Sequence, residues 1–267
     1  MSNELQLPRF IDSGTDRFPV IFLHGFLGCK EDWDEVAAPI GQTHRTIQVD
    51  LPGHGGSIGF ADGEYSIASA ARQLIDLMNR VGIPRCHLVG YSMGGRIALY
   101  LAITYPDRFE RIMIESGSAG LETESEREAR RQSDKALAEK LRGLPLAEFL
   151  NGWYDQPLFH TIRHDAARFA ALLERRLKND SGELAKALVG MGTGSQPYLA
   201  QRLRELPHQI LFAAGSEDDK YLGLALDLCD ECQDGTVWVC PEAGHALHFE
   251  KPSPYIETLR TFLLEGI

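Results

Sequence analysis

The sequence predicts an α/β protein with a mostly parallel central sheet, helices on both faces and an inserted helical cap. Short apolar runs typical of buried strands alternate with helical patterns along most of the chain. This alternation is typical of parallel strands joined by helical crossovers. It stops between about Leu121 and Leu206, where only helical patterns occur. We therefore expect a core made of residues 1–117 and 207–267, with a helical cap insertion at 118–206.

Six runs have the length and β-branched composition of buried strands. They are residues 19–23, 45–49, 86–89, 111–114, 209–213 and 236–240. Helical patterns lie between them at 31–40, 67–81, 94–105 and 221–228, and another follows Pro252. The insertion is flanked by two of these strand-like runs, so we expect it at the carboxyl edge of the sheet, where open α/β folds bind ligands. There it would act as a lid.

The composition excludes several partners. The chain has 267 residues and a formal net charge of -11, which argues against a nucleic-acid or anionic membrane surface because such surfaces require clustered positive charge. The amino terminus has no signal-peptide pattern, and no stretch of about 20 residues is uniformly apolar. We expect a cytoplasmic protein without membrane insertion.

The five cysteines are an odd and scattered set, which favours reduced thiols over a disulfide framework. The pair Cys229-x-x-Cys232 has the spacing of a redox pair or of half a zinc site. No second Cys or His pair at ligand spacing accompanies it. We therefore interpret it as two buried or half-buried thiols and expect no metal.

The strongest chemical motif is Gly90-Tyr91-Ser92-Met93-Gly94, which follows a buried strand and opens a helix. A Gly-x-Ser-x-Gly turn in this context exposes the serine hydroxyl above the sheet as a nucleophile or base. The backbone NH of Met93 would face an oxyanion at the positive end of the helix. The loop Leu23-His24-Gly25-Phe26 occupies the usual place of the second donor, and we assign it to the NH of Phe26. His24 itself has an alternative role, the satisfaction of local backbone groups.

An acid and then a histidine should follow the serine along the chain. The run Ser216-Glu217-Asp218-Asp219 follows a predicted strand, and its spacing favours Asp218 over Asp219 as the acid. His245 follows the last predicted strand and is the candidate base. His248 would be a metal ligand only if further ligands converged on it.

Arg96 lies four residues after Ser92, so a helix would place both on one side. A cation in the first helical turn opposes the helix dipole, which indicates an anionic partner. The alternative is an ion pair with a neighbouring carboxylate of the protein.

These motifs resemble those of the 2-succinyl-6-hydroxy-2,4-cyclohexadiene-1-carboxylate synthases of menaquinone and phylloquinone biosynthesis, which are lyases with the α/β-hydrolase fold. The resemblance runs nearly end to end. Its more specific parts are Arg96, Arg-Arg-Gln-Ser-Asp at 130–134, Trp-Tyr-Asp-Gln-Pro at 153–157, Met-Gly-Thr-Gly at 191–194 and Asp-Asp-Lys-Tyr at 218–221.

The resemblance implies a polyanionic small-molecule substrate and no cofactor. It implies that Ser92, activated by His245 and Asp218, acts as a base that starts the elimination of pyruvate. It also implies substrate-binding roles for Tyr91, Arg96, Arg130, Trp153 and a third arginine, at Arg176 or the adjacent Arg175. Arginine suits carboxylates because its planar fork binds them bidentately.

Several alternatives stay open at this point. Arg127 and Arg131 are interpreted as the solvated side of a charged helix, and Trp153 could equally be packing within the cap. The same serine, acid and histidine also serve hydrolases that cleave an ester or a carbon–carbon bond by acyl transfer. A ligand sensor that uses cap movement is a third hypothesis, against which the intact set of three argues.

Overall fold

The computed structural model describes residues 6–266 and contains a seven-stranded sheet in the order β1-β3-β2-β4-β5-β6-β7. All neighbouring strands are parallel except β1, which pairs with β3 in the antiparallel sense. The strands are β1 (Phe10–Asp12), β2 (Pro19–Leu23), β3 (Arg45–Val49), β4 (Cys86–Tyr91), β5 (Phe109–Glu115), β6 (Gln209–Gly215) and β7 (Asp234–Cys240). The six predicted strands are therefore confirmed, and β1 is an additional one.

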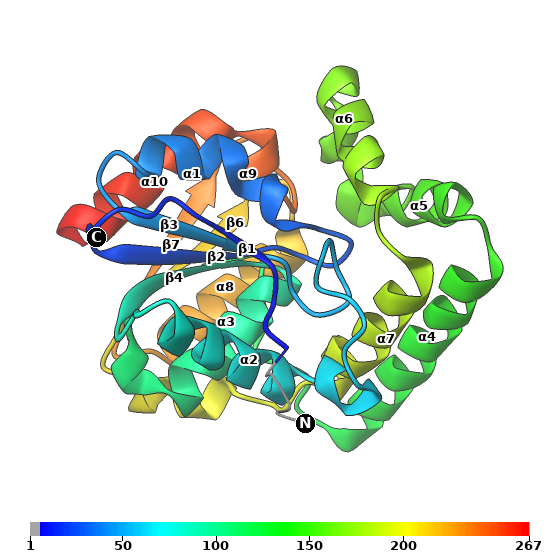
Figure 1. The fold of residues 1–267 in the computed structure, drawn as a ribbon, viewed down its shortest axis with the longest axis horizontal. Coiled ribbons are helices and arrows are strands. Elements are labelled where there is room, and N and C mark those ends of the chain that lie inside the picture. Colours follow the sequence, from blue (N-terminus) through cyan, green and yellow to red (C-terminus); the bar gives the residue numbers. More distant parts are fainter. Residues whose placement is uncertain (1–5, 267) are drawn as a thin grey trace.

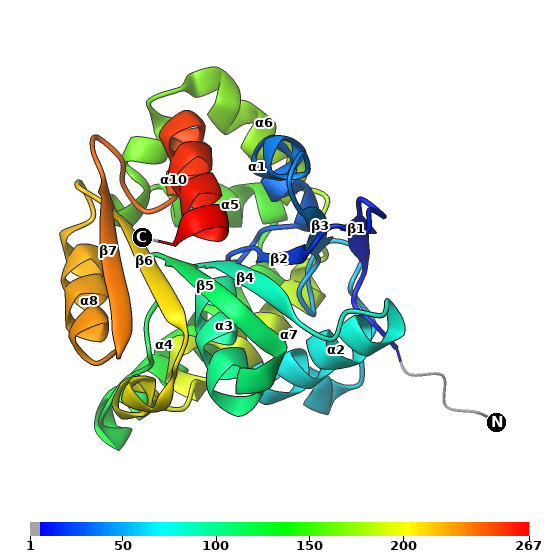
Figure 2. The ribbon, with the colours of Figure 1, turned by 90° about the vertical axis from the view of Figure 1, so that its left-hand side faces the viewer.

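Helices cover both faces of the sheet, as Figures 1 and 2 show. One face carries α1 (Asp34–Ile40), which continues the short 3-10 turn Lys30–Trp33, and α10 (Pro252–Glu265), preceded by the single turn α9 (Leu247–Glu250). The other face carries α2 (Ile67–Arg80), α3 (Met93–Thr104) and α8 (Asp219–Asp230).

Successive side chains along each strand point to opposite faces of the sheet, so the hydrophobic core forms two layers. In β2, Val20 and Phe22 pack with the helices of the α1 and α10 face. Ile21 and Leu23 pack on the opposite side with α2 and α3. All four side chains are buried. The sequence of β2 is therefore a continuous apolar run, which is typical of parallel strands covered on both faces.

Between β5 and β6 the regular secondary structure is entirely helical, and residues 124–205 are here called the helical insertion. Its main elements are α4 (Glu124–Gly143), α5 (Leu146–Tyr154), α6 (Ala166–Arg176) and α7 (Ser181–Met191), followed by the 3-10 segment Ala200–Glu205. The helical insertion projects from one side of the core in Figure 1. Leu27 and Ala246 of the core are buried in its hydrophobic cluster, so the two parts share an apolar contact.

The start of α7 is fastened to loops of the core. Asn179, just before α7, donates from its amide nitrogen to the Leu27 carbonyl at 2.9 Å and accepts from the Gly55 NH at 2.8 Å. Glu183 of α7 accepts hydrogen bonds from the Gly59 NH and from the hydroxyl of Tyr65. These contacts join the helical insertion to the loops that follow β2 and β3.

Within residues 6–266 no helix combines the length and apolarity needed to cross a bilayer. All five cysteines are free thiols. Cys229 and Cys232 are half-buried, in agreement with their interpretation as ordinary thiols.

Candidate active site

Ser92 lies at the sharp turn between β4 and α3. Its φ of 50° is a left-handed conformation that a non-glycine residue adopts at a cost. Gly94 is required at this turn because a Cβ there would lie 2.2 Å from the Leu23 carbonyl oxygen. The Ser92 NH donates to the Glu115 carbonyl at 2.8 Å, which ties the turn to the end of β5.

The structure brings Ser92, His245 and Asp218 together in hydrogen-bonding order. His245 Nδ1 lies 2.7 Å from Asp218 Oδ2, and its Nε2 lies 3.2 Å from Ser92 Oγ. An ionised Asp218 fixes the proton on Nδ1 and leaves Nε2 to accept the serine proton. Asp218 is itself oriented as the N-cap of α8, where it accepts from the Tyr221 NH at 3.2 Å. It is Asp218 and not Asp219, the first residue of α8, that contacts His245.

His248 contacts a carboxylate that sequence reasoning missed. Its Nδ1 lies 2.8 Å and 2.9 Å from the two carboxylate oxygens of Glu115, and its ring stacks on Trp33. Both partners are buried. Glu115 ends a strand, which is the one feature of the sequence that could have marked it as a residue of this edge. His248 is therefore oriented by a protein carboxylate rather than by convergent ligands.

His24 satisfies backbone groups, as the alternative interpretation held. Its Nε2 accepts from the Leu51 NH at 3.0 Å, so Nδ1 carries the proton and donates to the Gly25 carbonyl at 2.7 Å. The next residues pass directly beside the serine: a Cβ on Gly25 would lie 3.4 Å from Ser92 Cβ. This brings the loop that carries Phe26 close to Ser92, and both residues line one cavity. Met93, the residue after the serine, opens α3.

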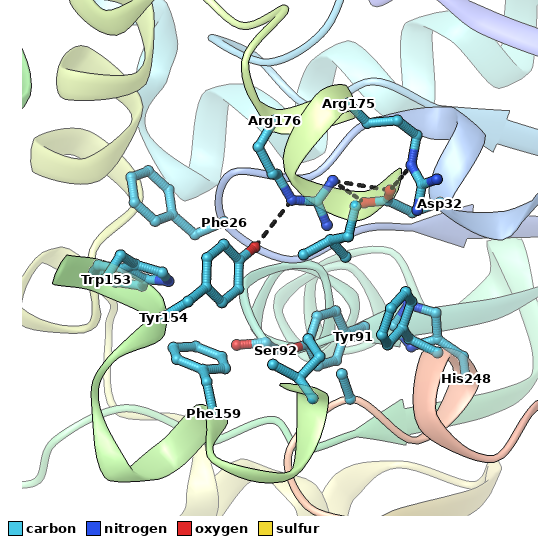
Figure 3. Close-up of a pocket in the computed structure, with 14 residues that line it drawn as sticks. Phe26, Asp32, Tyr91, Ser92, Trp153, Tyr154, Phe159, Arg175, Arg176 and His248 are labelled. Atoms are coloured by element: carbon cyan, nitrogen blue, oxygen red, sulfur yellow. Dashed lines mark hydrogen bonds and ion pairs between the residues drawn. The ribbon is translucent and has the colours of Figure 1, made fainter. Parts of the chain in front are cut away.

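A narrow cavity opens at Ser92 between the core and the helical insertion, and Figure 3 shows it. Apolar and aromatic side chains form much of its wall, as is common for small-molecule sites. The lining residues include Phe26, Tyr91, Trp153, Tyr154, Phe159, Arg175, Arg176 and His248. Tyr91 and Trp153 both border the cavity, and the substrate-binding roles that the resemblance implies for them stay predictions. Trp153 also packs against Phe149 and Phe26, so its packing and cavity positions coexist.

Arg96 is buried, with 9% of its surface exposed, and it makes no ion pair with any residue between 6 and 266. Its Nη1 donates to the Met191 carbonyl at the end of α7, at 2.6 Å. Burial lowers the pKa of this guanidinium to about 10, and the positive charge of Arg130 acts in the same direction. The alternative, an ion pair with a neighbouring carboxylate, is not what the structure shows.

The other predicted arginines are paired. Arg130 Nε donates to Asp134 at 2.8 Å, and neither Arg130 nor Arg96 is among the residues that line the cavity. Arg176 is buried in the cavity wall and donates to Asp32 at 2.8 Å. Arg175 also lines the cavity and donates to Asp32 at 3.1 Å, but it is more exposed.

Arg127 and Arg131 lie on the charged outer side of α4. Both form ion pairs with Glu124, and Arg131 also pairs with Glu128. These contacts are between partly exposed side chains three to seven residues apart. They support the interpretation of this segment as a solvated helix side.

The fold and the Ser92, His245 and Asp218 geometry define the class of protein. A model of the α/β hydrolase fold family matches residues 19–252. The enol-lactonase of Burkholderia xenovorans LB400 shares the architecture, with a TM-score of 0.83 at 18% identity over 97% of this chain and 96% of that chain. The chain is thus a member of the α/β hydrolase fold family.

Closer relatives define the particular family. The chain is 35% identical to the 2-succinyl-6-hydroxy-2,4-cyclohexadiene-1-carboxylate synthase of Serratia proteamaculans over 94% of both chains. It is 32% identical to the putative synthase of that name from Bacillus subtilis, over 91% of this chain and 89% of the relative. The structure of MenH from S. aureus superposes with a TM-score of 0.92 at 28% identity, covering 98% and 99% of the two chains. This chain belongs to the 2-succinyl-6-hydroxy-2,4-cyclohexadiene-1-carboxylate synthase family.

Proposed function

We propose that this enzyme is a carbon–oxygen lyase that eliminates pyruvate from 2-succinyl-5-enolpyruvyl-6-hydroxy-3-cyclohexene-1-carboxylate. The product is 2-succinyl-6-hydroxy-2,4-cyclohexadiene-1-carboxylate. The family membership supports this reaction. The single structural observation that carries it is Arg96, a buried guanidinium without a carboxylate partner one helical turn beyond Ser92. A site that leaves a buried cation uncompensated favours an anionic ligand.

Ser92 acts as the base in this reaction. His245 Nε2 takes the Ser92 hydroxyl proton, and the serine oxygen removes a proton from the substrate carbon next to the carbonyl. The electron pair of that C–H bond first gives an enolate and then forms a double bond to the neighbouring ring carbon. The existing ring double bond shifts by one position toward the carbon that carries the enolpyruvyl oxygen. The bond between the ring carbon and the enolpyruvyl oxygen breaks, and that oxygen leaves as the enolate of pyruvate. The proton lost by the substrate is held by the serine and histidine pair until the leaving group takes up a proton, so no water is consumed.

The enolate charge is stabilised by the backbone NH groups of Phe26 and Met93. Met93 is the first residue of α3 after Ser92, and the loop that carries Phe26 passes close to Ser92. Preorganised donors of this kind are most effective where water is excluded. The substrate carboxylates are bound by Arg96, Arg130 and Arg176, with Tyr91 and Trp153 bordering the ring. We assign the third arginine to Arg176 rather than Arg175 because Arg176 is the more buried in the cavity wall.

The segment at 118–206 serves as the cap of this site, with the core at 1–117 and 207–267. Support comes from the cavity, whose wall combines side chains of the core and of α5 and α6. The five free thiols are in keeping with a cytoplasmic location. The substrate is a polyanionic small molecule, and the formal net charge of -11 argues against a nucleic-acid partner.

The test is a coupled assay of pyruvate release from the family's substrate, run with the parent and with Ser92→Ala. We expect the variant to lose about 10³-fold or more of kcat, since the serine removes the proton in the transition state. Ser253→Ala, an exposed serine of α10, is the matched control and should keep full activity. A parent protein that releases no pyruvate would overturn the proposal.

Oxygen-18 water separates elimination from acyl transfer. A hydrolase of this fold incorporates the label at the cleaved bond because water resolves the acyl-enzyme. The proposed elimination leaves the ring product unlabelled, and mass spectrometry of that product reads the difference. Label in the ring product would favour the hydrolase instead.

A further inference from the structure

Tyr154 carries a buried hydroxyl whose proton has no acceptor within residues 6–266. Only 4% of the residue is exposed, and its oxygen accepts a hydrogen bond from Arg176 Nε at 3.1 Å. Burial raises the pKa of this phenol, so it remains protonated and able to donate. A buried donor without an acceptor is costly, which indicates that a bound molecule or water completes it.

The Arg176 guanidinium, beside the Tyr154 hydroxyl, has one terminal nitrogen that is not used by these partners. Its Nε is used by Tyr154 and its Nη1 by Asp32, at 2.8 Å. Figure 3 shows the remaining terminal nitrogen, Nη2, directed toward the centre of the cavity without a partner among the residues drawn. Asp32 is held in turn by the Cys29 NH at 3.2 Å and by Arg175, so the orientation of the guanidinium is fixed before any ligand binds.

The ring of Tyr154 is equally fixed. It packs edge-on against Phe159 at 5.3 Å and against Phe169 at 5.5 Å between ring centres. Rotation of the ring about its long axis does not move the hydroxyl, so the oxygen stays beside Arg176. Two donors, the Tyr154 hydroxyl and Arg176 Nη2, therefore border one cavity from adjacent positions.

We propose that Tyr154 is a further substrate-binding residue, whose hydroxyl completes with Arg176 a two-donor subsite for a carboxylate. Two donors on one side of the cavity match the two oxygens of a carboxylate, and charge-assisted hydrogen bonds of this kind are the stronger ones. The neighbouring Trp153 and Phe159 form an apolar wall beside the two donors. An apolar wall favours a carboxylate attached to a short carbon chain over a small hydrated anion.

The position of the subsite selects which carboxylate it binds. In Figure 3 Arg176 and Ser92 lie on opposite sides of the cavity, with Tyr154 between them. A carboxylate bound at Arg176 is therefore remote from the carbon that loses its proton. This step rests on the proposed function. In that reaction the terminal carboxylate of the flexible succinyl arm lies farther from the reacting carbon than the carboxylate attached to the ring, so it fits the remote subsite better.

Succinate is the probe, and its binding is measured by calorimetry with succinamide as the uncharged comparison. We expect the parent to bind succinate and not succinamide. Tyr154→Phe should bind succinate about 10-fold more weakly, the loss expected for one hydrogen bond to a charged group. Tyr105→Phe, at the end of α3 and outside the cavity wall, is the matched control and should bind as the parent does.

Tyr154→Phe keeps the packed ring, and an unchanged thermal unfolding midpoint would show that the fold is intact. Unchanged succinate binding in that variant, or no succinate binding to the parent, would overturn the subsite. Pyruvate release is assayed separately on the parent. A parent that binds succinate through Tyr154 but releases no pyruvate would retain the subsite and refute the proposed reaction.

Discussion

Arg96 and Arg176 are two buried arginines, both assigned to the substrate in the proposed function, that differ in what balances their charge. Arg176, in the helical insertion, has the Asp32 carboxylate at 2.8 Å and the Tyr154 hydroxyl at 3.1 Å. Among the described residues, the hydrogen-bond partner of Arg96, in the core helix α3, is the Met191 carbonyl at 2.6 Å. Burial lowers the pKa of Arg96 to about 10, whereas the pKa of Arg176 is raised above its ordinary value by Asp32 despite burial.

The difference separates two tasks within one site. An arginine with a buried protein carboxylate has a fixed orientation and contributes to the stability of the free protein. An arginine with a carbonyl alone leaves most of its charge for an anion that arrives with the substrate. We therefore expect Arg176 to matter for both folding and binding, and Arg96 to matter for binding alone.

Removal of the paired cation should have the largest effect on stability. Arg176→Met leaves the buried Asp32 with Arg175 alone, and the breakage of a buried pair costs about 3–5 kcal/mol. We expect a loss of about 3 kcal/mol in the free energy of unfolding, measured with urea. The double variant Arg176→Met with Asp32→Asn should recover part of this loss. Equal stability of the single variant and the parent would show that Arg175 alone compensates Asp32.

Removal of the unpaired Arg96 should reduce activity and leave stability unchanged or higher. Arg96→Met takes away a buried charge that no described carboxylate balances, so the urea midpoint should stay unchanged or rise. Pyruvate release should fall about 100-fold in kcat/KM, because a desolvated carboxylate of the substrate loses its partner. Strong destabilisation together with normal turnover would contradict the distinction between the two arginines.

Acid should affect the buried histidines before it affects the Asp32 pair. Burial lowers the pKa of His24, His44, His54 and His87, the last to about 3. The unfolded chain binds protons at these histidines below about pH 6.5 and the folded chain does not, so stability falls as the pH drops through that value. The pKa of Asp32 is lowered by its arginines, so its contribution persists until the pH falls below its unfolded value of 3.8.

A variant of His87 tests whether the buried histidines cause the loss of stability below pH 6.5. In His87→Asn the side-chain oxygen can take the place of Nδ1, which accepts from the Arg111 NH at 3.3 Å. We expect the slope of unfolding free energy between pH 6.5 and 5 to decrease by up to about 1.4 kcal/mol per pH unit, the share of one proton. Urea unfolding at several pH values measures this slope. An unchanged slope would mean that the other three histidines carry the acid sensitivity.

The sequence predicted those parts of the fold that depend on local patterns. Buried parallel strands are continuous apolar runs, so six of the seven were visible. β1 was missed because it has three residues at the edge of the sheet, with its middle residue exposed. The spacing of Ser92, Asp218 and His245 was readable for a related reason, since each follows a predicted strand.

The missing parts of the site depend on contacts between distant segments. Arg176 and Asp32 are 144 positions apart, and His248 and Glu115 are 133 apart. Without the fold, nothing in the charge pattern identifies Asp32 as the partner of one arginine rather than another. The Tyr154 hydroxyl was missed for the same reason, because its neighbours in the chain do not show which side chains converge on it.

The hydrogen bonds of Asn179 couple the unfolding of the core loops to that of the helical insertion. The Asn179 side chain binds both the carbonyl of Leu27, the residue after Phe26, and the Gly55 amide. We therefore expect these core loops and the start of α7 to unfold together. Hydrogen exchange at Gly55 should therefore report on the attachment of α7 as well as on its own loop. Excision of residues 118–206 would not yield a minimal hydrolase core, because the loop beside Ser92 would lose the support that shapes it.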